Sequence, residues 1–217
     1  MNVITETIQK LGIVPVIKIE DPSQAVPLAK ALARGGLPLA EVTFRTSAAA
    51  IAIRNIKKAC PEICLGAGTV TTTDQADAAL EAGASFLVSP GFNPRVVKYC
   101  VSKGVPVFPG TCTPGEMEQA MELGLDTVKF FPAEAAGGPA FLKAVGGPYP
   151  QLRFMPTGGV NPDNIGSYLK LKNVIACGGS WMVPEDRIAA KDYEAITRLA
   201  SEAVALAARC RREGGSL

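Results

Sequence analysis

Residues 64–90 read CLGAGTVTTTDQADAALEAGASFLVSP, and this stretch decides which fold the chain is expected to adopt. It begins with one apolar run, CLGAGT, and ends with another, FLVSP. The segment between them, TTDQADAALEAGA, is typical of a short helix, because acidic residues come early and a glycine stands near its end. A strand, a helix and a second strand in this order form the unit from which parallel sheets are built.

The same unit recurs along the whole chain. Apolar runs predict strands at 14–19, 39–44, 64–69, 86–90, 106–111, 127–132, 153–158 and 174–179. Their starts lie 20–26 residues apart, which suits one strand, one loop and one helix of about three turns. Eight such units favour a single α/β domain over residues 1–217, a closed (β/α)8 TIM barrel with an extra helix at 2–10. An open, doubly wound sheet is the alternative.

The ends of two helices are also predicted. In SQAVPLAKALARGG, Ser23 is expected to cap the start of a helix, and Gly35 with Gly36 to end it. At the end of the chain, Arg209, Arg211 and Arg212 are expected to lie on a solvated, fraying helix terminus.

The overall composition excludes several classes of protein. The 217 residues include 22 basic and 20 acidic ones, a net charge of +2, which gives no reason to expect nucleic acid or a membrane surface as partner. No apolar run reaches the roughly 18 residues of a transmembrane helix, and the N-terminus does not resemble a secretory signal. Six cysteines without a Cys-x-x-Cys pair fit a reduced, cytoplasmic protein. Cys60 and Cys64 are four apart but straddle Pro61, with no further ligand cluster after them, so no metal site is expected there.

The chain contains no histidine. A histidine-based catalytic triad and a histidine-based zinc site are therefore excluded. Acid–base chemistry would have to use carboxylates, lysine, tyrosine, cysteine or water. We expect neither a metal nor an organic cofactor.

The active sites of TIM barrels lie at the carboxyl ends of the strands, and polar residues stand near several predicted strand ends: Lys18, Glu41, Arg45, Thr69, Lys129 and Thr157. Lys129 is flanked by Val128 and Phe130 in a strand that should be buried. Burial of an unpaired ammonium is unfavourable, and the neutral amine is the form that attacks a ketone. A lysine whose stem reaches the surface between helices is an equally good interpretation.

Glu41 and Arg45 lie in the stretch LAEVTFRT. Their separation of four residues places both side chains on the same side of a regular strand. Glu41 could act as a base, and the planar fork of Arg45 could hold a substrate carboxylate. An internal structural ion pair is the alternative.

Two glycine-rich turns follow the last two predicted strands, TGGVNP at 157–162 and GGSW at 178–181. Glycine lets backbone N–H groups approach an anion, and a helix that follows offers its positive end. The loops after strands seven and eight are a frequent phosphate site in TIM barrels. The two turns together favour phosphate binding over simple chain reversal.

The chain also resembles a known family, the 2-keto-3-deoxy-6-phosphogluconate (KDPG) aldolases of the Entner–Doudoroff pathway. The matching stretches cover nearly the whole chain: VPVIKI, GGLPLAEVTFRT, GAGTV, SPGFN, VKFFPAE, MPTGGVNP and GGSWMVP. The resemblance implies a class I aldolase that forms a Schiff base and cleaves a phosphorylated 2-keto acid. Members of this family are commonly homotrimers, and some also act on 4-hydroxy-2-oxoglutarate.

The resemblance also implies roles for single residues. Lys129 matches the Schiff-base lysine, Glu41 the general acid–base, and Arg45 the group that binds the pyruvyl carboxylate. The remaining matches are further substrate contacts, at Thr69, Pro90, Phe131 and Thr157, and the phosphate site, at Gly158, Gly159, Gly179 and Ser180. Some relatives have arginine where this chain has Lys18, and lysine lacks the bidentate fork of arginine.

Two other functions remain compatible with these residues. A phosphate-binding isomerase or epimerase would use the same glycine-rich turns but would need no buried lysine. A non-catalytic barrel that binds a phosphometabolite would not turn over a keto acid. Trapping with borohydride and pyruvate would separate both from an aldolase.

Overall fold

The computed structural model describes residues 2–214, and in it the predicted barrel is confirmed. All paired strands run parallel. The strands are β1 (Ile13–Ile17), β2 (Leu39–Thr43), β3 (Cys64–Gly68), β4 (Phe86–Val88), β5 (Val107–Phe108), β6 (Gly110–Thr111), β7 (Thr127–Phe130), β8 (Arg153–Pro156) and β9 (Cys177–Gly179).

The predicted fifth strand, 106–111, is divided in two at Pro109. Its first half, β5, pairs with β4, and its second half, β6, pairs with β7. Proline has no N–H group to donate to a neighbouring strand, which explains the break at Pro109. Its carbonyl still accepts a hydrogen bond from the backbone N–H of Lys129, at 2.9 Å. Two bridges, Phe154 with Val174 and Thr157 with Gly178, join the β8 side to the β9 side. Since β9 also pairs with β1, the ring of strands is closed.

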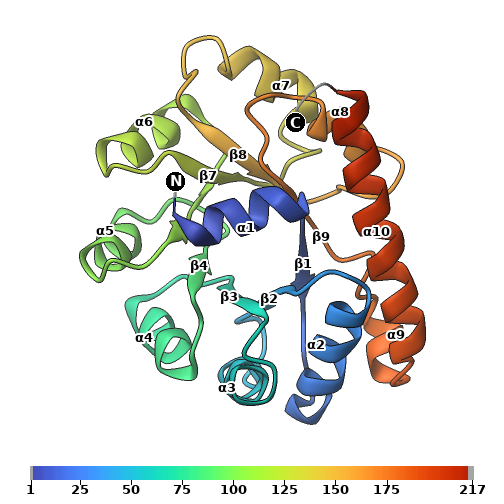
Figure 1. Cartoon of the computed structure of the whole chain (residues 1–217). Helices are drawn as coiled ribbons and strands as arrows, with labels where there is room; N and C mark the ends of the chain where they lie inside the picture. The colour runs from blue at the N-terminus through green and yellow to red at the C-terminus, as the bar shows by residue number, and fades with distance from the viewer. Residues whose placement is uncertain (1, 215–217) are drawn as a thin grey trace.

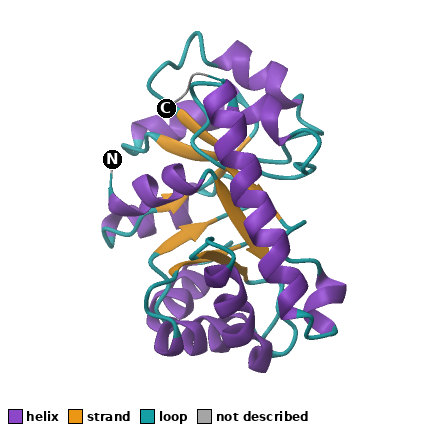
Figure 2. Ribbon diagram, turned by 45° about the vertical axis from the view of Figure 1, so that its right-hand side comes forward, coloured by secondary structure: helices purple, strands orange, loops and turns teal. Residues whose placement is uncertain are grey.

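Helices surround this ring, as Figures 1 and 2 show. They are α1 (Val3–Leu11), α2 (Ala25–Arg34), α3 (Ala49–Ala59), α4 (Thr73–Ala82), α5 (Pro94–Ser102), α6 (Pro114–Glu122), α7 (Gly138–Val145), α8 (Ile165–Leu169), α9 (Glu185–Ala189) and α10 (Tyr193–Glu213), with a short 3-10 helix, η1 (Pro22–Gln24), before α2. The extra helix α1 lies across the end of the barrel from which β1 starts (Figure 1).

Helix α4, which lies within residues 64–90, shows how local sequence sets the ends of a helix and its buried face. The Thr72 side chain accepts a hydrogen bond from the backbone of Gln75 and caps the first turn. Gly83 ends the helix in the left-handed conformation, at φ +104°, which glycine adopts without strain. The face toward the strands consists of alanines, Ala76, Ala79 and Ala82, all buried, so the helix can approach the sheet closely.

The predicted boundaries need two corrections. Most strands end one or two residues earlier than predicted, so Lys18 lies just beyond β1 and not within it. Ser23 does not cap α2: it lies in η1, where the Asp21 side chain accepts from the Ser23 backbone at 2.9 Å. Asp21 thus caps the short helix η1, and α2 continues from it after Gln24 without a side-chain cap. Gly35 and Gly36 end α2 as predicted.

The end of α10 is better anchored than predicted. Arg209 and Arg212 are exposed, but the Arg211 guanidinium is partly buried and donates to the carbonyls of Gln9 and Ile175. These contacts fasten α10 to the end of α1 and to the segment before β9. None of the helices in residues 2–214 is long and apolar enough to span a membrane.

Candidate active site

One cavity of about 230 Å³ opens where the strands end. All eleven residues predicted as catalytic, substrate-binding or phosphate-binding line it: Glu41, Arg45, Thr69, Pro90, Lys129, Phe131, Thr157, Gly158, Gly159, Gly179 and Ser180. They come from six different strands or the loops that follow them, so the closed barrel is what brings them together.

Lys129 lies in β7 and is only 5% exposed. Its backbone pairs with Gly110 of β6, and Lys129 lines the cavity, so its side chain lies on the inner face of the barrel. Nζ lies 4.9 Å from the centre of the Phe131 ring, within the range of a cation–π contact. The lysine therefore ends in the cavity and does not reach the outer surface between helices.

Glu41 lies in β2 and is 1% exposed. Its Oε1 is buried without a hydrogen-bond partner among the described residues. Desolvation raises the pKa of this carboxyl, and the positive charges of Lys129 and Arg45 oppose the rise. A side chain at Gly68, on the neighbouring strand β3, would place its Cβ 2.1 Å from Oε1, so this glycine makes room for the carboxyl group.

This raised pKa predicts how Glu41→Gln changes stability with pH. The folded protein holds the Glu41 proton at pH values where the unfolded chain has lost it, so the wild type loses stability as pH rises through that range. Glutamine has no such loss. In thermal unfolding followed by circular dichroism, Glu41→Gln should melt higher than wild type at pH 8, and the gap should close toward about pH 4. A gap independent of pH would contradict this account.

Arg45 follows β2, and its Nε donates to the Thr43 hydroxyl at 3.0 Å. Within residues 2–214, no contact of hydrogen-bond or ion-pair length joins Arg45 to Glu41, so the internal ion pair considered from the sequence is not formed. Thr69 adopts a left-handed backbone, at φ +57°. Such a conformation is unfavourable for a β-branched residue and is found mostly where function or packing enforces it.

The two glycine-rich turns line the same cavity, but their relation to helices differs from the prediction. Gly158 and Gly159 are left-handed, at φ +98° and +81°, which only glycine tolerates easily. Neither turn leads straight into a helix: α8 begins at Ile165 and α9 at Glu185, and each has only five residues. After the first turn, Asn161-Pro162 begins a further turn before α8. The positive end of a helix, which the sequence predicted as part of an anion site, is therefore not at either glycine-rich turn. The backbone N–H groups of the turns are the remaining candidates for binding an anion.

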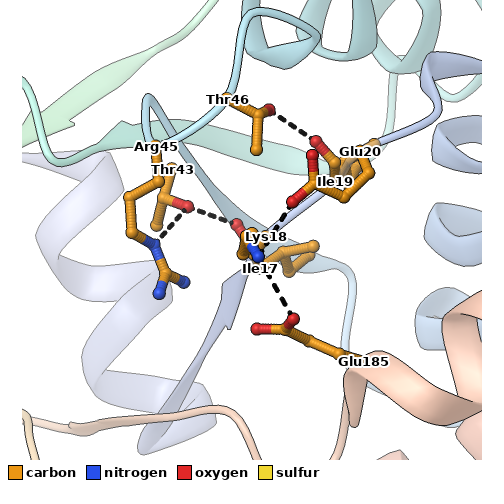
Figure 3. Close-up of polar contacts among 8 residues, drawn as sticks. All are labelled: Ile17, Lys18, Ile19, Glu20, Thr43, Arg45, Thr46 and Glu185. Carbon is orange, nitrogen blue, oxygen red and sulfur yellow. Dashed lines mark hydrogen bonds and ion pairs between the residues drawn. The ribbon is translucent and has the colours of Figure 1, made fainter.

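Lys18 lies outside the cavity wall and has two carboxylate partners. Nζ lies 2.8 Å from Oε1 of Glu20 and 3.3 Å from Oε2 of Glu185, at the start of α9 (Figure 3). Both carboxylates raise the pKa of Lys18, through hydrogen bonds first. The contact connects the end of β1 with α9, and Lys18 is not among the residues that line the cavity.

Sequence reasoning missed four lining residues: Val16, Thr43, Val160 and Gly178. Thr43 had a usable signal, because it has the same strand parity as Glu41 and Arg45. Gly178 had one too, since it belongs to the second glycine turn. A side chain there would place Cβ 2.3 Å from Oγ1 of Thr157.

All six cysteines are free thiols, and none lines the cavity. No group of three or more cysteine, aspartate or glutamate side chains in the described part of the chain is arranged to hold a metal ion.

Comparisons with known proteins agree on one family. The family model "KDPG and KHG aldolase" matches residues 4–199. A 2-dehydro-3-deoxy-phosphogluconate aldolase of Treponema pallidum is 49% identical, covering 93% of this chain and 96% of its own, and the KHG/KDPG aldolase of Escherichia coli K12 is 48% identical over 88% and 90%. A solved KDPG aldolase from Legionella pneumophila, with pyruvate captured as a covalent carbinolamine, has a TM-score of 0.90, 38% identity and coverage of 93% and 98%. The chain therefore belongs to the KDPG and KHG aldolase family.

Proposed function

We propose that this protein is a class I aldolase that cleaves 2-dehydro-3-deoxy-6-phosphogluconate (KDPG) to pyruvate and glyceraldehyde 3-phosphate. A second substrate would be 4-hydroxy-2-oxoglutarate, which gives pyruvate and glyoxylate. The observation that carries the proposal is the placement of a buried lysine, Lys129, and a buried carboxyl, Glu41, in one cavity at the strand ends. An isomerase or epimerase would have no use for this lysine.

The proposed reaction begins at the C2 ketone. The neutral amine of Lys129 attacks C2 and forms a carbinolamine, and Glu41 moves the protons needed to release water and leave an iminium ion. As the C3–C4 bond breaks, its electron pair moves into the iminium, and the C4 hydroxyl loses its proton to become the aldehyde. Glyceraldehyde 3-phosphate leaves, C3 of the enamine is protonated, and water releases pyruvate from Lys129.

The raised pKa of Glu41 supports this role. A carboxyl group transfers protons in both directions most readily when its pKa lies close to the working pH. Burial moves the pKa of Glu41 upward from the range of an ordinary carboxylate, toward neutrality. The absence of histidine from the sequence leaves this carboxyl as the best-placed proton carrier of the cavity.

The two ends of the substrate would bind to different parts of the wall. We propose that Arg45 and Thr69 hold the carboxylate next to C2, while Pro90, Phe131 and Thr157 shape the middle of the cavity. The phosphate would lie at the glycine-rich turns, against Gly158, Gly159, Gly179 and Ser180. Binding energy gained at the phosphate would help to orient the reacting carbons against Lys129.

The test of this proposal is the release of pyruvate from KDPG by the purified protein. Pyruvate can be measured with lactate dehydrogenase and NADH, and the substrate and its C4 epimer should be compared side by side. We expect turnover that EDTA does not reduce, because the protonated imine supplies the electron-withdrawing group that a metal would otherwise provide. Activity that vanishes with EDTA and returns with a divalent ion would mean a metal-dependent mechanism.

Ser180→Asp tests the phosphate end. A carboxylate at this position would repel the substrate phosphate, so kcat/KM for KDPG should fall by roughly 10- to 100-fold, the effect of about 1.4–2.8 kcal/mol. Cleavage of 4-hydroxy-2-oxoglutarate, which has no phosphate, should change much less. Gly179 is a poor choice for this test, because a Cβ there would lie 1.8 Å from the Trp181 ring.

Ser180→Asn is the matched control for Ser180→Asp. It has nearly the same size as aspartate but no charge, so it should retain most of the activity on KDPG. Equal losses with both substrates, or with both variants, would mean that residue 180 shapes the cavity and binds no phosphate.

The trimeric assembly is proposed from the family resemblance, and the location and partners from the composition of the chain. We propose a single-domain, cytoplasmic homotrimer with no nucleic acid or membrane partner. Light scattering coupled to size-exclusion chromatography would test the trimer, and a dimer or monomer would contradict it.

A further inference from the structure

Thr43, the last residue of β2, is 1% exposed, and its hydroxyl makes two hydrogen bonds. The hydroxyl lies 2.8 Å from the carbonyl oxygen of Ile17, at the end of β1, and 3.0 Å from Nε of Arg45 (Figure 3). The three groups form a short chain that runs from the backbone of β1 to the guanidinium at the cavity.

The chemistry of these groups fixes the direction of both bonds. A carbonyl can only accept, so the single proton of the Thr43 hydroxyl points at Ile17. A guanidinium N–H can only donate, so Nε of Arg45 donates to a lone pair of the same oxygen. The arrangement therefore holds one orientation of the hydroxyl and, through it, one position of Nε.

The hydrogen bond at Nε leaves the far end of the guanidinium available. In residues 2–214, the Arg45 side chain has no other hydrogen bond or ion pair, and both Nη atoms extend away from Thr43 in Figure 3. Two parallel N–H groups held at a fixed angle are what bidentate binding of a carboxylate requires. Without a fixed Nε, binding would have to order a long, flexible side chain at the same time.

We propose that Thr43 is a positioning residue: its hydroxyl transmits the fixed position of β1 to Arg45 and sets the angle at which the guanidinium meets the substrate carboxylate. The inference rests on the proposed function, in which Arg45 binds that carboxylate. Thr43 itself need not touch the reacting carbons. Its loss should weaken binding of pyruvate and raise KM more than it lowers kcat.

The chain contains a matched control for the structural part of this role. Thr46 donates to the carbonyl of Ile19 at 2.5 Å, so it too joins the segments that follow β1 and β2 (Figure 3). In residues 2–214, no hydrogen bond joins its hydroxyl to the Arg45 guanidinium. Thr46→Val therefore removes the same kind of hydroxyl-to-carbonyl bond without removing the contact to the guanidinium.

The experiment compares Thr43→Val, Thr43→Ser and Thr46→Val, and adds Arg45→Ala alone and combined with Thr43→Val. Pyruvate affinity is measured from how the rate of inactivation by borohydride depends on the pyruvate concentration. KM and kcat for KDPG and the melting temperature are measured for each variant as well. Thr43→Val should weaken pyruvate binding about 3- to 10-fold, as expected when a flexible side chain must be ordered anew. Thr43→Ser, which retains the hydroxyl, should stay near wild type. Thr46→Val should lower the melting temperature but leave pyruvate affinity unchanged.

The Arg45→Ala background decides the cause. If Thr43 acts through the guanidinium, Thr43→Val should have no further effect on pyruvate affinity once Arg45 is absent. The inference would be overturned if Thr43→Val weakened pyruvate binding as much in the Arg45→Ala protein as in wild type. It would also be overturned if, in the wild-type background, Thr43→Val weakened pyruvate binding no more than Thr46→Val does. If Arg45→Ala alone leaves pyruvate affinity unchanged, the assignment of Arg45 in the proposed function fails, and the inference with it. Should Thr43→Val not fold, Thr43→Cys, with its weaker donor and acceptor, replaces it.

Discussion

Lys129→Met is expected to abolish turnover of KDPG, with a fall in kcat on the order of 10⁴–10⁶-fold, as is typical when a covalent nucleophile is removed. Methionine is about as long and flexible as lysine and suits a site that is 5% exposed, next to an aromatic ring. The fold should therefore persist, and the loss should come from the missing amine. The measurement is the lactate dehydrogenase assay, with the melting temperature as a check on folding.

Lys18→Met is the matched control, because Lys18 stands near the same end of the barrel but turns toward Glu20 and Glu185. Its ion pairs are partly exposed, and pairs of this kind contribute little to stability because water screens them. We expect Lys18→Met to remain active within a few-fold of wild type. Comparable losses from both lysine variants, or substantial activity left in Lys129→Met, would contradict the Schiff-base account.

Glu41→Gln is expected to lower kcat by roughly 10²–10⁴-fold, the usual contribution of a general acid–base group. Glutamine keeps the shape that fits beside Gly68, so pyruvate binding should suffer less than turnover. The pH profile gives a second reading. If catalysis requires ionised Glu41, wild-type activity should fall as the pH drops through the pKa of Glu41, which lies above that of an ordinary glutamate. This limb should be missing from the variant.

A nearly unchanged kcat in Glu41→Gln would mean that the carboxyl group has only a packing role. If kcat does fall, the pH profile separates loss of the acid–base group from a general loss of folded protein, because unfolding would reduce activity at all pH values without removing one limb.

The repeated strand–helix units made the fold predictable from the sequence. Strand runs spaced 20–26 residues apart, with helix stops such as Gly83, depend on local chain geometry, so they can be recognised without tertiary contacts. The division of the fifth strand at Pro109 could not be predicted in this way, because it depends on which neighbour each half pairs with. The partial burial of Arg211 was missed for the same reason: its acceptors, at Gln9 and Ile175, are far away in the sequence.

Locating the site was easier than describing its contacts. Lys129 and Glu41 could be singled out because a charged residue inside an apolar strand is unusual wherever it occurs. Thr43 was overlooked, since a threonine is ordinary in a strand and its importance comes from its two contacts. The glycine turns were found, but the coordinates were needed to show that the Trp181 ring leaves no room for a side chain at Gly179.

The most direct test of the central claim is to treat the protein with sodium borohydride in the presence of pyruvate and to map the product by peptide mass spectrometry. Reduction of an imine with pyruvate would leave a stable adduct on the amine that formed it. The account predicts loss of activity, one adduct per chain, and that adduct on the peptide containing Lys129, with none in Lys129→Met. An adduct on another lysine, or none at all while wild-type enzyme remains active, would contradict it.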